Sequence, residues 1–162
     1  MSSSPATGET FRFPVRVYYE DTDAAGVVYY ANYLKFMERA RTEWLSSLGF
    51  DLETLERVQG VGFVVHRVEI DYRLPARLGD RLDATLTLIE LTRARMVMSQ
   101  KVLRDDELVA NARVALACLD RANWRPTRIP AYLHAKLEST KWTPTPPEGA
   151  HSALRTAGRA PE

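Results

Sequence analysis

Two aspartates stand close together in a short polar stretch between a strand pattern and a helix pattern. Asp21 and Asp23 are followed by Gly26, and the apolar spacing of a long helix begins at about Ala31. A carboxylate at such a junction can face the positive end of a helix, where free backbone N–H groups can hold an oxygen that gains negative charge. The combination of a carboxylate with an oxyanion site predicts acyl transfer to water.

The two aspartates need not share one role. Asp is common in turns and near helix starts because its side chain accepts backbone N–H bonds, and we expect Asp21 to be the structural one. A calcium loop counted from Asp21 would place Ala25 at the fifth ligand position and Asn32 at the twelfth. Because an EF-hand needs a bidentate glutamate at the twelfth position, no metal is expected.

The sequence argues against the mechanism of a conventional serine or cysteine hydrolase. The chain has no G-x-S-x-G motif, and its single cysteine, Cys118, lies in an apolar strand pattern typical of a core residue. A carboxylate can cleave a thioester by attacking the carbonyl carbon or by acting as the base that activates water. The sequence leaves both routes open.

The apolar spacing predicts an α+β domain in which an antiparallel sheet curls around one long helix. A strand is expected first, then the helix, which Gly49 ends, then a short second helix or an irregular connection, and finally four more strands. The expected ranges are 11–19 for the first strand, 31–48 for the helix, 51–58 for the connection, and 63–74, 81–91, 94–104 and 108–119 for the later strands.

Three details of the later strands follow from the pattern. Val64, Val68, Ile70, Tyr72 and Leu74 are expected to share a face of the strand at 63–74. His66 has the same parity, so it could approach an acyl pocket, although a lone histidine on an apolar face is more often structural. The segment 105–107 is expected to form a polar hairpin turn.

Four segments resemble the hotdog-fold acyl-CoA thioesterases of the 4-hydroxybenzoyl-CoA thioesterase type, most closely the Tol-Pal-associated branch. They are 17–23, 26–29, 36–41 and 72–80, within a match that runs from about Phe11 to Asp120. The resemblance implies a hotdog fold, in which a five-stranded antiparallel sheet wraps around a long central helix. It also implies hydrolysis of an acyl-CoA to a free acid and coenzyme A.

The same resemblance implies roles for single residues. Asp23 takes the place of the catalytic carboxylate, and the backbone amide of Tyr30 takes the place of the helix-start donor that polarises the thioester carbonyl. Members of the branch often have histidine where this chain has Tyr30, so only a backbone role carries over. Gly26 would leave room for the thioester to approach the backbone, or would serve only as a turn residue.

Further residues are candidates for substrate binding. Arg93 and Arg95 begin a strand where hotdog thioesterases often contact the pantetheine arm or the phosphates of coenzyme A. Arginine forks suit phosphate oxygens, but exposed strand ends also carry arginine for solubility. The full set of expected substrate-binding residues is Tyr19, Gly26, Val65, His66, Arg93 and Arg95.

Composition agrees with one globular domain. The resemblance implies no cofactor of its own, since coenzyme A would be part of the substrate. The chain has 162 residues, of which 45% are hydrophobic, and a formal net charge of +1, which gives no reason to expect nucleic-acid binding. No signal peptide or membrane-spanning stretch is apparent, so a cytoplasmic protein is expected. The expected organisation is a flexible N-terminus at 1–10, a hotdog domain at 11–125, and an extension at 126–162 with a short helix at 131–139 and a mobile tail.

The resemblance also implies partners. Hotdog thioesterases usually pair and often form tetramers, so a homo-oligomer with active sites between protomers is expected. An acyl carrier protein could present the thioester in place of coenzyme A. The alternatives to a thioesterase are a module that binds acyl-CoA or acyl carrier protein without turnover, and a hotdog enzyme such as a hydratase. The preferred acyl group is not predicted.

Overall fold

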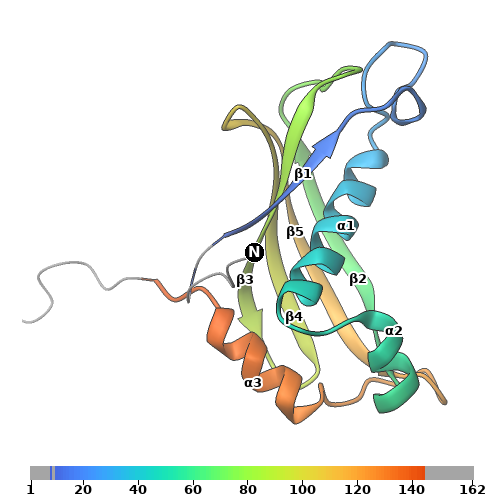
Figure 1. Ribbon diagram of the computed structural model, residues 1–162, viewed down its shortest axis with the longest axis vertical. Helices are drawn as coiled ribbons and strands as arrows, with labels where there is room; N and C mark the ends of the chain where they lie inside the picture. Colours follow the sequence, from blue (N-terminus) through green and yellow to red (C-terminus); the bar gives the residue numbers. More distant parts are fainter. Residues whose placement is uncertain (1–7, 9, 145–162) are drawn as a thin grey trace, which may run out of the picture.

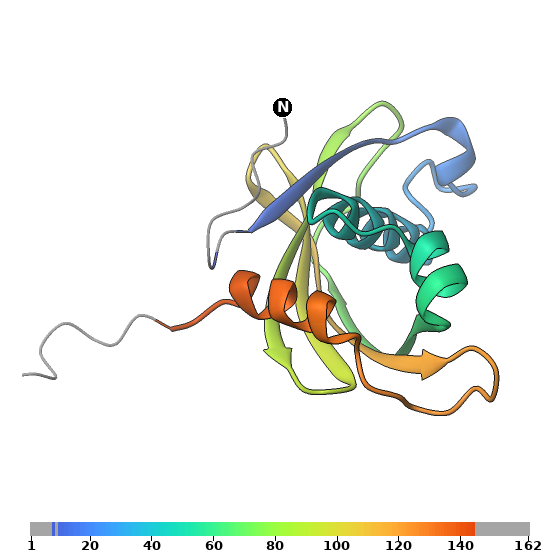
Figure 2. The same cartoon turned by 60° about the horizontal axis from the view of Figure 1, so that its bottom comes forward.

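A strongly curved antiparallel sheet forms the frame of the molecule, and one long helix fills its concave side (Figures 1 and 2). The computed structural model describes residues 8 and 10–144. The sheet has five strands in the order β1-β3-β4-β5-β2, and every neighbouring pair is antiparallel. This arrangement confirms the predicted hotdog fold.

The elements follow the predicted order. The strands are β1 (Phe11–Arg16), β2 (Val61–Tyr72), β3 (Arg81–Leu91), β4 (Arg95–Arg104) and β5 (Glu107–Asp120). The helices are α1 (Asn32–Ser47), α2 (Leu52–Thr54) and α3 (Ala131–Thr140), and shorter helical turns are η1 (Tyr19–Asp21) and η2 (Leu55–Gln59).

The apolar side of α1 explains why the sheet closes around it. Tyr33, Phe36, Met37, Ala40 and Trp44 are each 3% exposed or less, and their spacing places them on one side of the helix. The helix ends at Gly49, whose φ of +90° is the left-handed conformation that favours glycine after a helix. The prediction of a deeply buried helix that Gly49 ends is confirmed.

The first strand is shorter than predicted. It ends at Arg16, and the chain turns into η1 instead of continuing to Tyr19. The turn forms because the Asp21 carboxylate accepts the Tyr18 N–H at 2.8 Å, a local hydrogen bond that competes with the strand ladder.

A β-bulge at His66 corrects the predicted face of β2. Val65 pairs with Leu116 and Arg67 pairs with Ala115, so His66 is an extra residue without a partner in the ladder. Because side chains alternate along a strand, one extra residue reverses the parity on either side of it. Val65 therefore lies on the helix side with Ile70, and Val64 lies on the opposite face.

The hairpin between β4 and β5 is tighter than predicted. Asp105 and Asp106 have φ values of 49° and 63°, as expected for a two-residue turn of the I′ type. Glu107 already pairs with Arg104 in the ladder, so it belongs to β5 and not to the turn.

The segment after β5 joins the same core. The predicted short helix is α3, in which Leu133 and Leu137 are fully buried with the side chains of the sheet and α1. The Trp142 N–H donates to the Leu88 carbonyl of β3 at 2.9 Å. Most of the predicted N-terminal segment 1–10 and the predicted tail beyond Pro144 lie outside the described residues.

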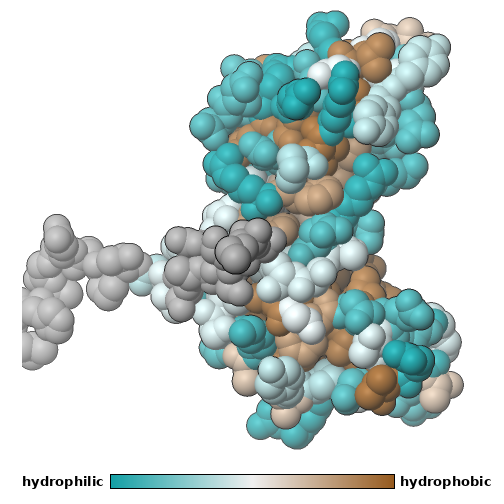
Figure 3. Space-filling model, viewed as in Figure 1, coloured by the Kyte–Doolittle hydropathy of each residue, from teal (hydrophilic) through white to brown (hydrophobic). Residues whose placement is uncertain are grey.

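The surface is mainly polar. On the face shown in Figure 3, apolar residues come to the surface in separate areas of the upper and lower halves, and polar residues surround both. Within the part of the chain that the structure describes, no helix has the length and apolar character that crossing a membrane requires.

Candidate active site

The loop between β1 and α1 is anchored by Asp21. Its carboxylate accepts the Tyr18 N–H, and its backbone carbonyl accepts the Tyr29 N–H at 2.9 Å and the Asn32 side-chain amide at 2.8 Å. Asp21 is only 5% exposed. These contacts join the start of the loop to the start of the helix, which is the structural role expected for this residue.

Asp23 lies two residues further on and has a different environment. It is exposed, and one carboxylate oxygen accepts the Ala25 N–H at 2.8 Å within its own turn. Among residues 8 and 10–144, no donor lies within hydrogen-bonding distance of its second carboxylate oxygen, Oδ2. Asp23 therefore has an oxygen available for chemistry.

Gly26 closes the Asp23 turn. The Gly26 N–H donates to the Asp23 carbonyl at 3.0 Å, and Gly26 has a φ of +78°. A Cβ atom placed on Gly26 would meet no other atom within 4 Å. The positive φ, and not a close contact within the chain, thus accounts for a glycine at this position.

The Tyr30 amide lies just before α1, the 16-residue helix whose N-cap is Ala31. The neighbouring amides of Tyr29 and Asn32 donate to Asp21 and Tyr29 carbonyls, respectively. In the described ranges no acceptor lies within hydrogen-bonding distance of the Tyr30 N–H. A free N–H at the positive end of a helix is a suitable donor to an oxyanion.

Four tyrosines surround this helix start. Ring centroids lie 4.7 Å apart for Tyr29 and Tyr30, 6.3 Å for Tyr30 and Tyr72, and 5.5 Å for Tyr33 and Tyr72. The Tyr72 hydroxyl donates to the Tyr30 carbonyl at 2.9 Å, and the Tyr33 hydroxyl accepts the Ala76 N–H at 3.2 Å. This tyrosine cluster fixes the backbone on the C-terminal side of the free amide.

The cluster also carries a titratable group close to Asp23. The pKa of Tyr29 is raised, mainly by its hydrogen bond with the Tyr30 side chain, and the negative charge of Asp23 adds to the effect. The Tyr29 hydroxyl therefore stays protonated at neutral pH. Sequence reasoning did not assign Tyr29, Tyr33 or Tyr72 to the site; Tyr29 and Tyr33 lie within the same sequence run as Asp23, but nothing in the sequence brings Tyr72 to them.

A second loop, between β2 and β3, supports the loop between β1 and α1. The Val28 N–H donates to the Ala76 carbonyl at 2.8 Å, and the Val17 N–H donates to the Asp80 carbonyl at 2.9 Å. The Asp80 carboxylate accepts the Arg77 N–H at 2.9 Å and an Arg104 guanidinium N–H at 2.8 Å. The pKa of Asp80 lies below its usual value, chiefly because of the Arg77 N–H and further because of Arg104, while burial opposes the shift.

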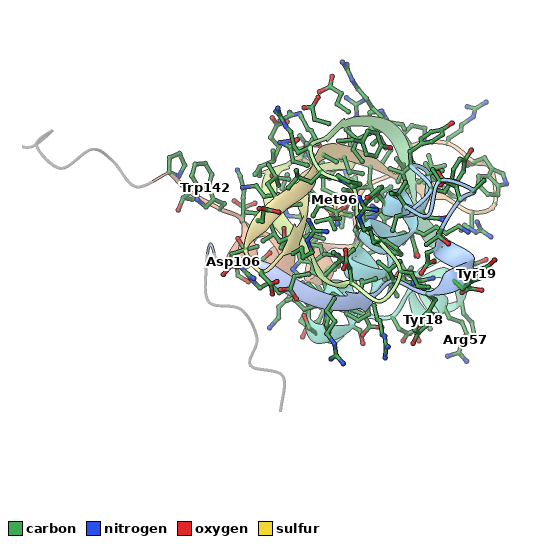
Figure 4. All side chains as sticks on the ribbon, turned by 90° about the horizontal axis from the view of Figure 1, so that it is seen from above. Tyr18, Tyr19, Arg57, Met96, Asp106 and Trp142 are labelled. Atoms are coloured by element: carbon green, nitrogen blue, oxygen red, sulfur yellow. The ribbon has the colours of Figure 1, made fainter. Side chains whose placement is uncertain are left out.

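An open groove of ≈ 500 Å³ lies in front of Asp23. Two of the candidates for substrate binding, Tyr19 and Gly26, line it together with Asp23, and Leu78 of the second loop also lines it. Tyr19 is 82% exposed and lies at the outer rim of the molecule (Figure 4).

The other candidates lie elsewhere in this chain. Arg93 and Arg95 flank the turn between β3 and β4, whereas Asp23 lies beyond the opposite end of β3, a strand about 35 Å long at the usual rise per residue. His66 is exposed at the bulge of β2, and Val65 lines a separate cavity beside α1. Within one protomer, none of these four residues meets Asp23.

Metal ligands do not converge on the groove. In the described part of the chain, no three His, Cys, Asp or Glu side chains come together in a group that could hold a metal ion. The titratable carboxylate that lines the groove is that of Asp23.

Comparisons with known proteins agree with the fold. Residues 17–137 match the model of the thioesterase-like superfamily. An acyl-CoA thioesterase YbgC from Haemophilus influenzae is 43% identical over 131 residues, which cover 81% of this chain and 96% of that protein. The chain thus belongs to the thioesterase-like superfamily of hotdog proteins.

Solved structures give the same assignment. A probable thioesterase from Bartonella henselae superimposes with a TM-score of 0.72 at 36% identity, covering 75% of this chain and 100% of that one. A 1,4-dihydroxy-2-naphthoyl-CoA thioesterase from Synechocystis superimposes with a TM-score of 0.74 at 27% identity, covering 80% of this chain and 96% of that one.

The different environments of the two aspartates predict different effects on stability. Asp21→Ala is expected to lower the free energy of unfolding by about 1–3 kcal/mol, because the Tyr18 N–H loses its acceptor in a partly buried hydrogen bond. Asp23→Ala removes an exposed contact and is expected to cost less than about 1 kcal/mol. Urea denaturation of both variants measures this difference, and equal losses would contradict the division of roles.

The lowered pKa of Asp80 predicts a dependence of stability on acid. Its contribution is fully present above the pKa of an unfolded aspartate, about 4, and is lost as the pH falls through the lower pKa of the folded state. Asp80→Asn is therefore expected to be less stable than wild type at neutral pH and to lose less stability below pH ~4. Thermal melting over this pH range tests the expectation, and parallel curves for the two proteins would contradict it.

Proposed function

We propose that the protein is an acyl-CoA thioesterase, which hydrolyses the thioester to a free acid and coenzyme A. One observation carries the proposal: the exposed carboxylate of Asp23 lies in the turn before α1, close to a helix-start amide that has no acceptor in the described ranges. Membership of the thioesterase-like superfamily and the names of the relatives support the reaction class.

In the proposed reaction, the thioester carbonyl oxygen accepts the Tyr30 N–H. Asp23 either attacks the carbonyl carbon, forming a mixed anhydride that water then hydrolyses, or removes a proton from the attacking water. In both routes the carbon–sulfur bond breaks and the thiolate of coenzyme A takes up a proton. Negative charge develops on the carbonyl oxygen as Asp23 or water adds to the carbonyl carbon. The helix-start amide stabilises this charged oxygen more strongly than the neutral carbonyl of the substrate.

The complete site is proposed to form between two protomers. β2 is an edge strand of the sheet, and Tyr72 lies at its active-site end while Val61 lies at its far end. If two copies pair antiparallel along β2, the far end of one strand comes beside the active-site end of the other. Val65 and His66 of one protomer would then approach Asp23 of its partner.

Two further parts of the proposal do not follow from the pairing of two protomers along β2. Arg93 and Arg95 are exposed, and they are proposed to contact the phosphates of coenzyme A from the partner protomer. The oligomer is proposed to be a tetramer of two such pairs. An acyl carrier protein remains a second possible donor of the acyl group, because it presents the same thioester.

Replacing Asp23 tests the reaction. Asp23→Asn is expected to lower kcat by on the order of 10²- to 10⁴-fold, because the amide is neither a base nor a nucleophile of comparable strength. Glu20→Gln is the matched control, since Glu20 is an exposed carboxylate in the same loop, and it is expected to keep wild-type activity. The measurement is steady-state thiol release from a panel of short, long and aromatic acyl-CoAs.

The assay is compatible with the cysteine of this protein. Cys118 is fully buried, and burial raises the pKa of its thiol to about 11, so it should add little signal at neutral pH. Unchanged activity of Asp23→Asn would contradict the mechanism. If wild type binds acyl-CoA but releases no thiol from any donor, including acyl carrier protein, the protein is a binding module.

A proline substitution tests the amide separately. Tyr30→Pro removes the backbone N–H and is expected to lower kcat by on the order of 10²- to 10³-fold. Tyr30→Phe keeps the amide and is expected to retain most of the activity. Circular dichroism and melting curves establish that both variants are folded, and a folded Tyr30→Pro enzyme with wild-type kcat would exclude the amide as oxyanion donor.

A further inference from the structure

A broad groove lies at the β1 edge of the sheet. Its volume is ≈ 580 Å³, and its walls come from β1, the first residues of β3, Tyr18 and the turn between β4 and β5. β1 and β2 are the opposite edges of the sheet, so this groove is remote from the edge along which two protomers are proposed to pair. It also shares no lining residue with the Asp23 groove: Tyr18 lines this groove, and Tyr19 lines the other.

Two arginines stand directly opposite each other in this groove, where β1 ends and β3 begins. Arg16 and Arg81 are partners in the β1–β3 ladder. The Val17 N–H donates to the Asp80 carbonyl at 2.9 Å, which makes Arg16 and Arg81 a non-hydrogen-bonded pair. In such a pair the two Cα atoms lie about 4.5 Å apart and the side chains are closer than at any other position of the ladder.

Both arginines point away from the core. Side chains alternate between the two faces of a strand, and the neighbouring residues Val15 and Leu82 are buried in the core. Arg16 and Arg81 are exposed, and both line the groove. Like charges directly opposite each other destabilise a pair of strands. The strand ladder alone therefore gives no reason for two arginines at these positions.

Neither guanidinium is neutralised by a neighbour. Among residues 8 and 10–144, Arg16 and Arg81 form no ion pair and no side-chain hydrogen bond. Arg12, on the same face of β1, provides the contrast, because it donates to the carboxylates of Asp83 at 3.4 Å and Asp106 at 3.1 Å. These two carboxylates are thus occupied by Arg12. The groove has two free positive charges at the end where Arg16 and Arg81 lie.

Two adjacent guanidinium groups suit an oxyanion with two charges. Each presents a planar fork of N–H donors that matches a pair of phosphate oxygens. A phosphate monoester carries about 1.5 to 2 negative charges at neutral pH, so one such group would neutralise both arginines. A carboxylate carries a single charge and would leave one arginine unpaired. The chemistry of the pair therefore favours a phosphate monoester.

The rest of the groove can hold an organic body attached to that phosphate. A phosphate group on the two arginines occupies only one end of the groove. Pro14 and the exposed Tyr18 supply apolar surface, and the exposed Asp105 carboxylate, which has no hydrogen-bond partner in the described ranges, can accept hydroxyl or amino groups. Figure 4 shows Asp106 near the start of β1 and Tyr18 beyond its end.

We propose that this groove binds a small organic phosphate monoester whose body carries hydroxyl or amino groups, such as a sugar phosphate, with the phosphate on Arg16 and Arg81. The site goes beyond the proposed hydrolysis, because it requires neither Asp23 nor turnover. It is also separate from the proposed contacts of coenzyme A, since Arg93 and Arg95 lie at the far end of β3.

Isothermal titration calorimetry of the full chain with ribose 5-phosphate tests the proposal, with ribose and inorganic phosphate as the two halves of the ligand. We expect ribose 5-phosphate to bind and ribose to bind at least about tenfold more weakly, because the charged hydrogen bonds to arginine are lost. Inorganic phosphate should also bind more weakly, because it makes no contact with the rest of the groove. Asp23→Asn should bind ribose 5-phosphate as wild type does.

Variants of the two arginines locate the site. Arg16→Gln and Arg81→Gln should each weaken the binding of ribose 5-phosphate by about tenfold or more. Arg57→Gln is the matched control, because Arg57 of η2 is an exposed arginine without an ion pair in the described part of the chain, and it should leave binding unchanged. Without ligand, Arg81→Gln should melt at or above the temperature of wild type, because a like charge across the ladder is removed.

The same titration in saturating coenzyme A separates this site from the proposed active site. We expect the affinity for ribose 5-phosphate to be unchanged. Competition would overturn the proposal, because the groove would then be part of the coenzyme A site. The proposal is also wrong if ribose 5-phosphate does not bind at millimolar concentration, if inorganic phosphate binds equally well, or if the folded Arg16 and Arg81 variants bind as wild type does.

Discussion

The burial of α1 is the constraint on which the rest of the structure depends. A helix with Phe36, Met37 and Trp44 on one side cannot be stable in water by itself, and the curved sheet supplies the enclosing surface. Once the helix is enclosed, its N-terminus can emerge only at one end of the sheet. The loop from β1 must cross that end, so Asp23 and the positive end of the helix come together as a consequence of core packing.

The loop separates two neighbouring carboxylates by environment. Asp21 is buried and its oxygens are used to hold the loop, whereas Asp23 is exposed and keeps an oxygen with no partner in the described ranges. The tyrosine cluster and the Asp80 contacts add rigidity around this turn. A loop held in this way needs little further ordering, which is what the proposed catalysis by positioned groups requires.

The middle of the same helix also meets a polar side chain of the sheet. Arg41 of α1 donates to the buried Gln100 of β4, and a partly buried charge without a carboxylate partner in the described ranges costs stability.

The sequence by itself determined the local features. These are the order of the strands along the chain, the buried helix ending at Gly49, and the run that contains Asp21, Asp23 and Tyr30. These depend on periodicity and turn chemistry, which act over a few residues. Only the tertiary structure decided which distant residues meet. It brought Tyr72 to the helix start, reversed the parity of β2 through the bulge at His66, and separated Arg93 and Arg95 from Asp23. The reason is that register and bulges are set by pairing between strands remote in the sequence, and no local pattern records them.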